Sequence, residues 1–372
     1  MNTRMGDLKI MKRVCKIRIY PNETQKKLIE TNLSACNFVW NKYLEANKKA
    51  PDEKKDFISA YDFRKELNVR KKEDPDYIWL KEASTKATSD AIITAEKAFK
   101  AFFKGIRSYP RFKSKRRNNL FDSYYFIKDG IKFYMDIPEK KNKIKIPILG
   151  EIRVTRKEYL PMEYLVSSGR VIKSPTDKYY VAFTYDIPEY SGDKEFIPGI
   201  KVKMSMDPYV SVYDENDILI EIYPNFIYQD NYKKIDDRLY GFQCIISKKA
   251  NISYDKAIAR FVEERDREPD DNYKDILKAQ CYNSGNIQKV RVKLNRCFET
   301  RTNIANDAIN KIVADIVKDR PKYIIFEEYQ EDESDDAEDV LKSNFFKFKT
   351  KLISKCEYYG IEFREEKETE EE

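Results

Sequence analysis

IKVKMSMD (residues 200–207), VSVYD (210–214) and ILIEIYP (218–224) are three consecutive runs of largely alternating apolar residues. Short turns separate them, and this pattern predicts three consecutive antiparallel strands. YIIFEE (323–328) is an apolar run of strand length that ends in two carboxylates. The four runs predict a sheet that carries acidic side chains at the end of one of its strands.

Helical segments connect these runs and follow them. We predict a helix around 227–247 and a long one from about 286 to 319, whose apolar residues recur mostly along one side. Residues 340–359 are also predicted to be helical, with Gly360 as the stop, before a last short strand, IEFRE (361–365). Three antiparallel strands, helices and then a strand that ends in a carboxylate form the element order of an RNase H-like nuclease fold.

The N-terminal half begins with a predicted strand. KIMKRVCKIRIY (9–20) alternates around Val14, Ile17 and Ile19, with basic residues on its exposed positions. From 21 to 46 the apolar residues recur at three- and four-residue steps, which predicts a helix directly after the strand.

The clearest helix is STKATSDAIITAEKAFKAFFK (84–104). Ser84 or Thr85 can cap it, and Gly105 ends it. A shorter helix is predicted from 57 to 69. The 84–104 helix has an apolar side and a lysine-rich side, which alone is typical of an ordinary amphipathic helix with a solvated face.

Residues 121–188 favour β-structure. Their short alternating runs are separated by Asp-Gly, lysine-rich and proline turns. They predict a small antiparallel β-barrel that the strand at 9–20 could join. The fold class is therefore α+β and multidomain, with the barrel at 9–20 and 109–195, an inserted helical domain at 21–108 and an RNase H-like domain at 200–372.

The composition excludes several classes of chemistry. The 372 residues contain no histidine, which excludes Ser-His-Asp and Cys-His catalysis, histidine metal sites and a histidine general base. No two of the six cysteines form a CxxC pair, so no structural zinc site is predicted. No apolar run approaches the roughly 20 residues of a membrane span, and no signal peptide is seen, so we expect a soluble intracellular protein.

The charge is divided unevenly along the chain. Residues 327–339 hold nine acids and no base, and residues 362–372 hold seven acids and two bases. The rest of the chain keeps 69 basic and 48 acidic residues, a net charge of +21. A body this basic points to nucleic acid, and solubility charge with a disordered acidic tail is the alternative.

The basic residues cluster after the clearest helix. From Lys97 to Phe121 there is no acid, and nine bases are interleaved with Tyr109 and Phe112. Bases beside aromatic residues suit phosphate contacts combined with stacking on nucleobases or riboses, and a nuclear-localisation-like run is the weaker alternative. This basic stretch consists of Lys97, Lys100, Lys104, Arg107, Arg111, Lys113, Lys115, Arg116 and Arg117.

Several motifs together resemble TnpB, the family of RNA-guided nucleases of bacterial insertion sequences from which type V CRISPR effectors descend. KIRIYPNETQKKLIE and CNFVWNKYLE are similar to its opening strand, proline and first helix. AEKAFKAFFKG and YPRFKSKRR are similar to its central helix and the basic stretch after it. NFFKFKTKLISKCEYYGIEF is similar to the helix and strand before its zinc finger. The resemblance implies a wedge domain (the barrel), a helical recognition domain and a RuvC domain.

The resemblance also implies a nuclease site, with departures. SMDPYVSVY has Asp207 where the family has its first catalytic aspartate, and YIIFEEY has Glu327 where it has the catalytic glutamate. Pro208 and Tyr209 stand where the family has a glycine, and Tyr209 is expected to crowd the site. The family's two CxxC pairs and third catalytic aspartate have no counterpart in the sequence.

A nuclease of this fold needs two Mg²⁺ ions held by about three or four carboxylates. We therefore expect Asp207 and Glu327 to be vestigial in a C-terminally truncated RuvC domain, with no catalytic residue and no metal site.

Together with the basic body, the resemblance implies a nuclease-dead, TnpB-like RNA-guided repressor of the TldR type. Such a protein needs guide RNA as its essential partner and no other cofactor, and it occupies double-stranded promoter DNA beside a short flanking motif. We expect a monomer with one RNA, without membrane contact, associated with the nucleoid in the bacterial cytoplasm. An active RNA-guided DNA endonuclease and a decayed transposon product that binds only its own RNA are the alternatives.

The expected nucleic-acid surface combines three segments. The start of the 84–104 helix is near the flanking motif by resemblance to the family, and the first strand and the basic stretch contact the backbone. The predicted residues are Lys12, Arg13, Lys16 and Arg18 of the first strand, Lys86, Ser89 and Asp90 of the helix, and the basic stretch together with Tyr109 and Phe112.

Overall fold

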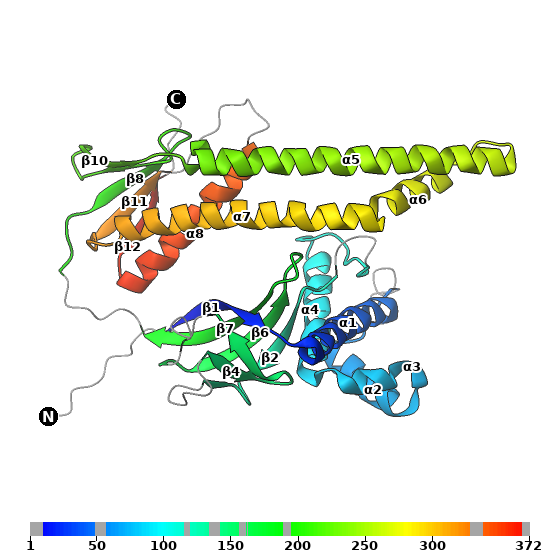
Figure 1. Cartoon of the computed structure of the whole chain (residues 1–372). Coiled ribbons are helices and arrows are strands. Elements are labelled where there is room, and N and C mark those ends of the chain that lie inside the picture. The colour runs from blue at the N-terminus through cyan, green and yellow to red at the C-terminus, as the bar shows by residue number, and fades with distance from the viewer. Residues whose placement is uncertain are drawn as a thin grey trace. The chain divides into compact units, whose positions relative to one another are not determined.

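The computed structural model shows two compact units (Figure 1). The N-terminal unit is Lys12–Ile187, and the C-terminal unit is Pro188–Glu372 together with Met1–Met11. Each unit has a hydrophobic core of its own. The residues described are 10–48, 57–114, 120–133, 142–155, 161, 163–188, 195–327 and 338–366, without the side chains of 338–342.

Local sequence signals set the helices of the N-terminal unit. A capping box starts the first of them, because the Asn22 side chain accepts a hydrogen bond from the Gln25 backbone N–H (2.8 Å) and the Gln25 side chain accepts one from the Asn22 N–H (3.0 Å). Ser84 caps the central helix, and Gly105 follows it with φ 70°, as predicted. The helices are α1 (Glu23–Ala46), α2 (Ala60–Glu73), α3 (Pro75–Ile78), a 3₁₀ helix (Trp79–Glu82) and α4 (Thr85–Phe103).

The predicted first strand is confirmed as β1 (Ile10–Tyr20). Ile17 and Ile19 are buried, as the alternation requires. The prediction that Val14 alternates with Ile17 and Ile19 on the buried face is wrong, because Val14 is 66% exposed. It occupies an even position, so its side chain is on the same face of the strand as Lys16 and Arg18.

Seven strands form the sheet of the N-terminal unit, in the order β2-β6-β7-β1-β5-β4-β3. Every described register in it is antiparallel. Besides β1, the strands are β2 (Ser123–Ile127), β3 (Lys132–Phe133), β4 (Lys143–Ile146), β5 (Gly150–Val154), β6 (Val166–Lys173) and β7 (Tyr179–Pro188).

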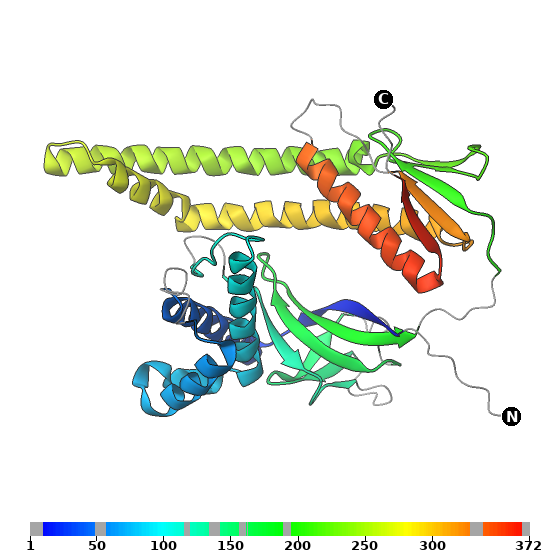
Figure 2. The same ribbon diagram turned by 180° about the vertical axis from the view of Figure 1, so that it is seen from behind.

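This sheet is not the closed barrel that the sequence predicted. In the described residues, β2 and β3 are its two ends and do not pair with each other. Helices provide the missing packing, since Tyr43 of α1 and Phe99 of α4 belong to the same buried cluster as Phe183 of β7. Figure 2 shows α4 beside β2. Because the helices bury the apolar face of the sheet, the sheet can stay open.

The sheet of the C-terminal unit has the predicted element order. Its strand order is β10-β9-β8-β11-β12, with β8, β9 and β10 antiparallel and β11 parallel to both β8 and β12. The strands are β8 (Ile200–Met204), β9 (Val210–Tyr213), β10 (Leu219–Tyr223), β11 (Tyr323–Glu327) and β12 (Glu362–Glu366).

One helix of this unit is longer than predicted. The helix expected at about 227–247 continues to Arg265, and an unpredicted helix follows it. Beyond residue 247 the helix packs on a partner distant in sequence, since Ala250 and Ile246 form a small buried cluster with Ile287. Figures 1 and 2 show α5 and α7 side by side along much of their length. The helices are a 3₁₀ helix (Phe226–Tyr228), α5 (Asp230–Arg265), α6 (Asp271–Tyr282), α7 (Gly285–Ile316) and α8 (Glu338–Tyr359).

Candidate nucleic-acid interface

The exposed face of β1 carries cations at alternate positions. Lys12, Lys16 and Arg18 are exposed there, whereas Arg13 is half-buried on the opposite face. Lys12 forms an ion pair with Asp186 of β7 (3.0 Å). Of the four cations predicted on this strand, three therefore lie on one accessible face.

Aromatic rings lie under these cations. The guanidinium groups of Arg18 and Arg153 lie 5.0 Å and 5.4 Å from the centre of the Tyr20 ring. The Lys16 ammonium lies 4.5 Å from the centre of the Tyr180 ring on β7. Cation–π contacts of this kind hold the charged groups in place at the surface.

The neighbouring strands extend the same face. Arg153 of β5 pairs in register with Tyr20 on one side and with Lys143 of β4 on the other, so the three side chains point the same way. Lys143 and Arg153 are exposed. They are absent from the residues predicted from sequence, although KIKIP and EIRVT show the same signal as β1, with bases at the exposed positions of a strand.

The three residues predicted at the start of α4 differ from one another in exposure and in their contacts. Lys86 is exposed and Ser89 is half-buried. The Asp90 carboxylate accepts from the Arg170 guanidinium of β6 at 2.7 Å, in an ion pair whose side chains are 27% and 42% exposed. Asp90 is therefore engaged within the protein through one of its two carboxylate oxygens.

The described part of the basic stretch contains two kinds of cation. Lys97, Lys104, Arg107 and Arg111 are exposed, and none of them has an ion-pair partner among the described residues. Lys100 pairs with Glu96 at 3.1 Å. Lys115, Arg116 and Arg117 lie outside the described residues.

Lys113 is held differently from its neighbours. Its ammonium group lies 5.0 Å from the centre of the Trp40 ring and 4.6 Å from that of Phe121. Burial lowers the pKa of this ammonium. Lys113 thus packs between two rings, which makes its contribution to an outer surface smaller than that of Arg111.

The two predicted aromatic residues are also distinct. Tyr109 is half-buried and packs edge-on against Phe99 (5.5 Å between ring centres) and Phe102 (5.3 Å), so its ring already has partners inside the protein. Phe112 is 37% exposed. Of the two, Phe112 offers the more accessible ring for stacking.

Helix α1 fixes the segment that carries these side chains. The Trp40 indole N–H donates to the Arg111 carbonyl (3.1 Å). The Asn41 amide donates to the Lys113 carbonyl (2.9 Å) and accepts from the Lys113 N–H (2.7 Å). Three hydrogen bonds to one helix therefore order the backbone of the basic stretch before any ligand binds.

The two carboxylates predicted to be nuclease remnants, Asp207 and Glu327, have different surroundings. Glu327 at the end of β11 stands in register with Lys203 of β8, and its Oε2 lies 3.2 Å from the Lys203 Nζ. Asp207 is exposed in the turn after β8, four residues beyond the position that faces Glu327. A cation therefore occupies the position opposite the glutamate.

Tyr209 does not crowd this site, which corrects an expectation from the sequence. It is fully buried, and its hydroxyl donates to the Asn344 carbonyl (3.1 Å). Its ring stacks on Phe345 and meets Phe226 edge-on. Tyr209 is a core residue of the C-terminal unit.

Among the described residues, no group of three or more Asp, Glu, Cys or His side chains is arranged to hold a metal ion. The Glu327 carboxylate pairs with the Lys203 ammonium, which competes for the oxygen that a Mg²⁺ ion requires.

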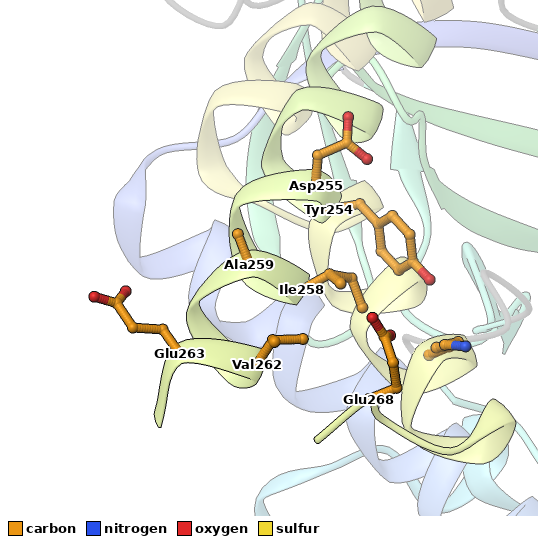
Figure 3. Close-up of a pocket in the computed structure, with 8 residues that line it drawn as sticks. Tyr254, Asp255, Ile258, Ala259, Val262, Glu263 and Glu268 are labelled. Atoms are coloured by element: carbon orange, nitrogen blue, oxygen red, sulfur yellow. The ribbon is translucent and has the colours of Figure 1, made fainter. Parts of the chain in front are cut away.

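A pocket of about 590 Å³ lies elsewhere in the C-terminal unit, between α5 and the start of α6 (Figure 3). Tyr254, Ile258 and Val262 give it an apolar wall, and Asp255, Glu263 and Glu268 line it as well. With three carboxylates and one base, Lys274, the pocket does not suit a phosphate group.

A family comparison matches the N-terminal segment. Residues 11–56 match the helix-turn-helix domain HTH_OrfB_IS605. In the described part of this helix-turn-helix segment the structure has β1 followed by α1. The match supports the resemblance to the TnpB family, because it covers the residues of KIRIYPNETQKKLIE and CNFVWNKYLE.

Three solved structures are similar to the chain at low identity. A Cas12f1–sgRNA–target DNA complex is 11% identical with a TM-score of 0.49, covering 96% of this chain and 89% of that chain. A CRISPR–Cas12f ternary complex is 12% identical with a TM-score of 0.30, covering 92% and 72%. A Cas12i–crRNA–dsDNA complex is 11% identical with a TM-score of 0.31, covering 94% and 52%. These values do not assign an activity to the chain.

No curated protein matches the sequence. Within the described residues, no helix combines the length and the apolarity needed to cross a bilayer.

Proposed function

We propose that the protein is a guide-RNA-directed DNA-binding protein without nuclease activity, which represses transcription by occupying promoter DNA beside a short flanking motif. Guide RNA and double-stranded target DNA are its partners, and one protein binds one RNA. The helix-turn-helix match and the fixed cations of the N-terminal unit support nucleic-acid binding.

The Lys203–Glu327 ion pair is the observation that supports the proposed lack of nuclease activity. In a two-metal mechanism, carboxylates hold the ions that stabilise the attacking and the leaving oxygen. Here the glutamate faces an ammonium group, and Asp207 lies past the position in register with it. The C-terminal unit then acts as a scaffold for the complex.

In such a complex, the protein surface does not select the target sequence outside the short flanking motif. Base pairing between guide and target selects the site, and the protein contacts the backbone and a short motif. A surface of ordered cations is sufficient for the backbone contacts. Occupancy alone can block a promoter, so no chemical step is required.

The cleavage assay tests this proposal. The RNA that copurifies with the protein is sequenced, and a labelled DNA duplex that matches its guide portion is incubated with the complex in Mg²⁺ and separately in Mn²⁺. We expect binding without cutting. We also expect Asp207→Ala and Glu327→Ala to leave target affinity within about twofold, because both side chains are at least partly exposed and their contacts are weak.

Urea unfolding of both variants is the control for stability. Guide-dependent nicking that either substitution abolishes would show a working endonuclease and would overturn the proposal. A copurifying RNA whose sequence matches no chromosomal promoter would favour the decayed transposon product instead.

A second prediction concerns the flanking motif. The double variant Lys86→Ala with Ser89→Ala should weaken binding to DNA that carries the motif by about tenfold to a hundredfold, because base-edge contacts discriminate by roughly 1–3 kcal/mol each. Guide RNA affinity should not change. Competition binding with duplexes that carry or lack the motif measures the effect.

Lys81→Ala with Thr94→Ala is the matched control, since both side chains are exposed near or on α4 and neither is in the predicted set. If the Lys86 and Ser89 variant loses affinity for RNA and for DNA to the same extent, this surface contacts only backbone.

A further inference from the structure

Helix α7 carries a stripe of three cations along one side. Lys289, Lys293 and Arg296 are exposed and follow one another at steps of four and three residues. At 100° per residue they cover about 60° of the helix surface, and they span roughly 10 Å along its axis. We call these three residues the α7 stripe.

The stripe faces away from the packed side of the helix. Ile287, Val290 and Leu294 belong to or pack on the small cluster that joins α7 to α5. On a helical projection these apolar residues lie about 100° to 160° from Lys289. The stripe is therefore on a side of α7 that its packing with α5 leaves free.

The charge around the stripe is one-sided. Residues 276–298 contain five bases and no acid, and among the acid-free stretches of the chain only Lys97–Phe121 is longer. The three cations have no ion-pair partner among the described residues. Other cations of α7 do have ion-pair partners, since Arg301 pairs with Asp236 (2.7 Å) and Lys311 pairs with Asp307 (2.7 Å).

The stripe lacks the aromatic partners of the sheet face in the N-terminal unit. Phe298 is the only aromatic residue of α7, and it is half-buried with the Arg301 guanidinium 5.3 Å from its ring centre. Binding of single strands usually combines a basic groove with rings on which bases stack. A straight row of cations without rings fits the phosphates of a double helix, whose bases are already stacked.

We propose that the α7 stripe binds the phosphate backbone of a nucleic-acid duplex, without sequence preference. The proposal rests on the proposed function for the presence of a duplex in the complex. It adds a contact surface in the C-terminal unit, where the predicted site residues included no nucleic-acid contact. The contact is electrostatic, so its strength depends on salt.

The test is the triple variant Lys289→Ala, Lys293→Ala and Arg296→Ala in the full chain. Fluorescence anisotropy measures its affinity for a 20-base-pair DNA duplex, an RNA–DNA hybrid of the same length and a single-stranded RNA of the same length. Loss of three phosphate contacts should lower the slope of log affinity against log salt by about 2.7 for the duplexes. Between 50 and 200 mM salt, the wild type should then lose about 40-fold more duplex affinity than the variant does. Single-strand affinity should change less than about threefold.

Lys248→Ala with Lys249→Ala and Lys256→Ala is the matched control. These α5 lysines are exposed, and their removal changes the net charge equally, but they spread over about 100° of their helix surface rather than about 60°. The control should keep the duplex slope of the wild type. An unchanged slope in the stripe variant, or an equal loss for duplex and single strand, would overturn the proposal.

The test of the α7 stripe can fail independently of the test of the proposed function. If the stripe variant loses duplex affinity but the wild type carries no guide RNA, the stripe stands and guided binding fails. If guided target binding is intact and the stripe variant behaves like the wild type, guided binding stands and the stripe proposal fails. Circular dichroism of each variant checks that α5 and α7 remain helical.

Discussion

Replacing Lys97, Lys104, Arg107 and Arg111 together with alanine should weaken RNA binding by about 10³-fold at 50 mM salt. These four exposed cations have no ion-pair partner among the described residues, so their charge is available to phosphates. Four contacts to a single strand contribute about 2.8 to the slope of log affinity against log salt. Titrations of a labelled RNA from 50 mM to 1 M salt measure both the affinity and the slope.

A control variant separates local contacts from net charge. Lys27, Lys65, Lys72 and Lys81 are exposed on helices of the same unit and can be changed to alanine together, with the same loss of charge. Screening limits the reach of a surface charge to about 8–10 Å at moderate salt, so this variant should bind RNA within about threefold of the wild type. An equal loss in both quadruple variants would mean that the basic stretch attracts RNA only through overall charge.

Phe183→Ala should destabilise the whole N-terminal unit by about 3–5 kcal/mol. Phe183 is fully buried, and its ring meets those of Phe126 and Phe133 edge-on. Removing a buried phenylalanine loses its transfer free energy and leaves a cavity. Urea unfolding followed by circular dichroism and by aromatic fluorescence measures the change, with Tyr61→Ala, at a 62% exposed site of α2, as the variant that should change stability by less than about 1 kcal/mol.

The same experiment tests how the N-terminal unit is divided. Phe183 lies in the sheet, yet it shares one buried cluster with Tyr43 and Phe99 of the helices. Both tryptophans of the chain, Trp40 and Trp79, lie in the helical part of this unit, so we expect Phe183→Ala to shift their fluorescence transition to lower urea. A tryptophan transition that Phe183→Ala leaves unchanged would instead support the division at residue 108 that was predicted from sequence.

Local signals account for the parts of the fold that were predictable. The capping box at Asn22 and Gln25 and the Ser84 cap fix where α1 and α4 begin, because they involve residues three positions apart. The alternation in 200–224 gave β8, β9 and β10 with short turns, since a strand's pattern repeats every two residues. Exposed cations on β1 followed from the same alternation.

Long-range packing accounts for the differences. The open sheet depends on α1 and α4 covering its apolar face, and α5 beyond its predicted end at residue 247 packs through Ala250 on Ile287 of α7. Although α1 directly follows β1, the buried clusters join residues far apart in sequence, such as Tyr43 with Phe183 and Ala250 with Ile287. A periodicity argument applies to one element at a time and therefore predicts neither outcome.

The candidate site shows the same division at the level of single residues. The sequence alone determined which residue types are present: a +21 body, no histidine, and carboxylates at Asp207 and Glu327. Only the tertiary structure decided their partners, because strand register puts Lys203 opposite Glu327 and helix packing brings Asp90 to Arg170. Register and packing join residues that are 80 to more than 120 positions apart, and the free energy that selects them belongs to the whole core rather than to any local stretch.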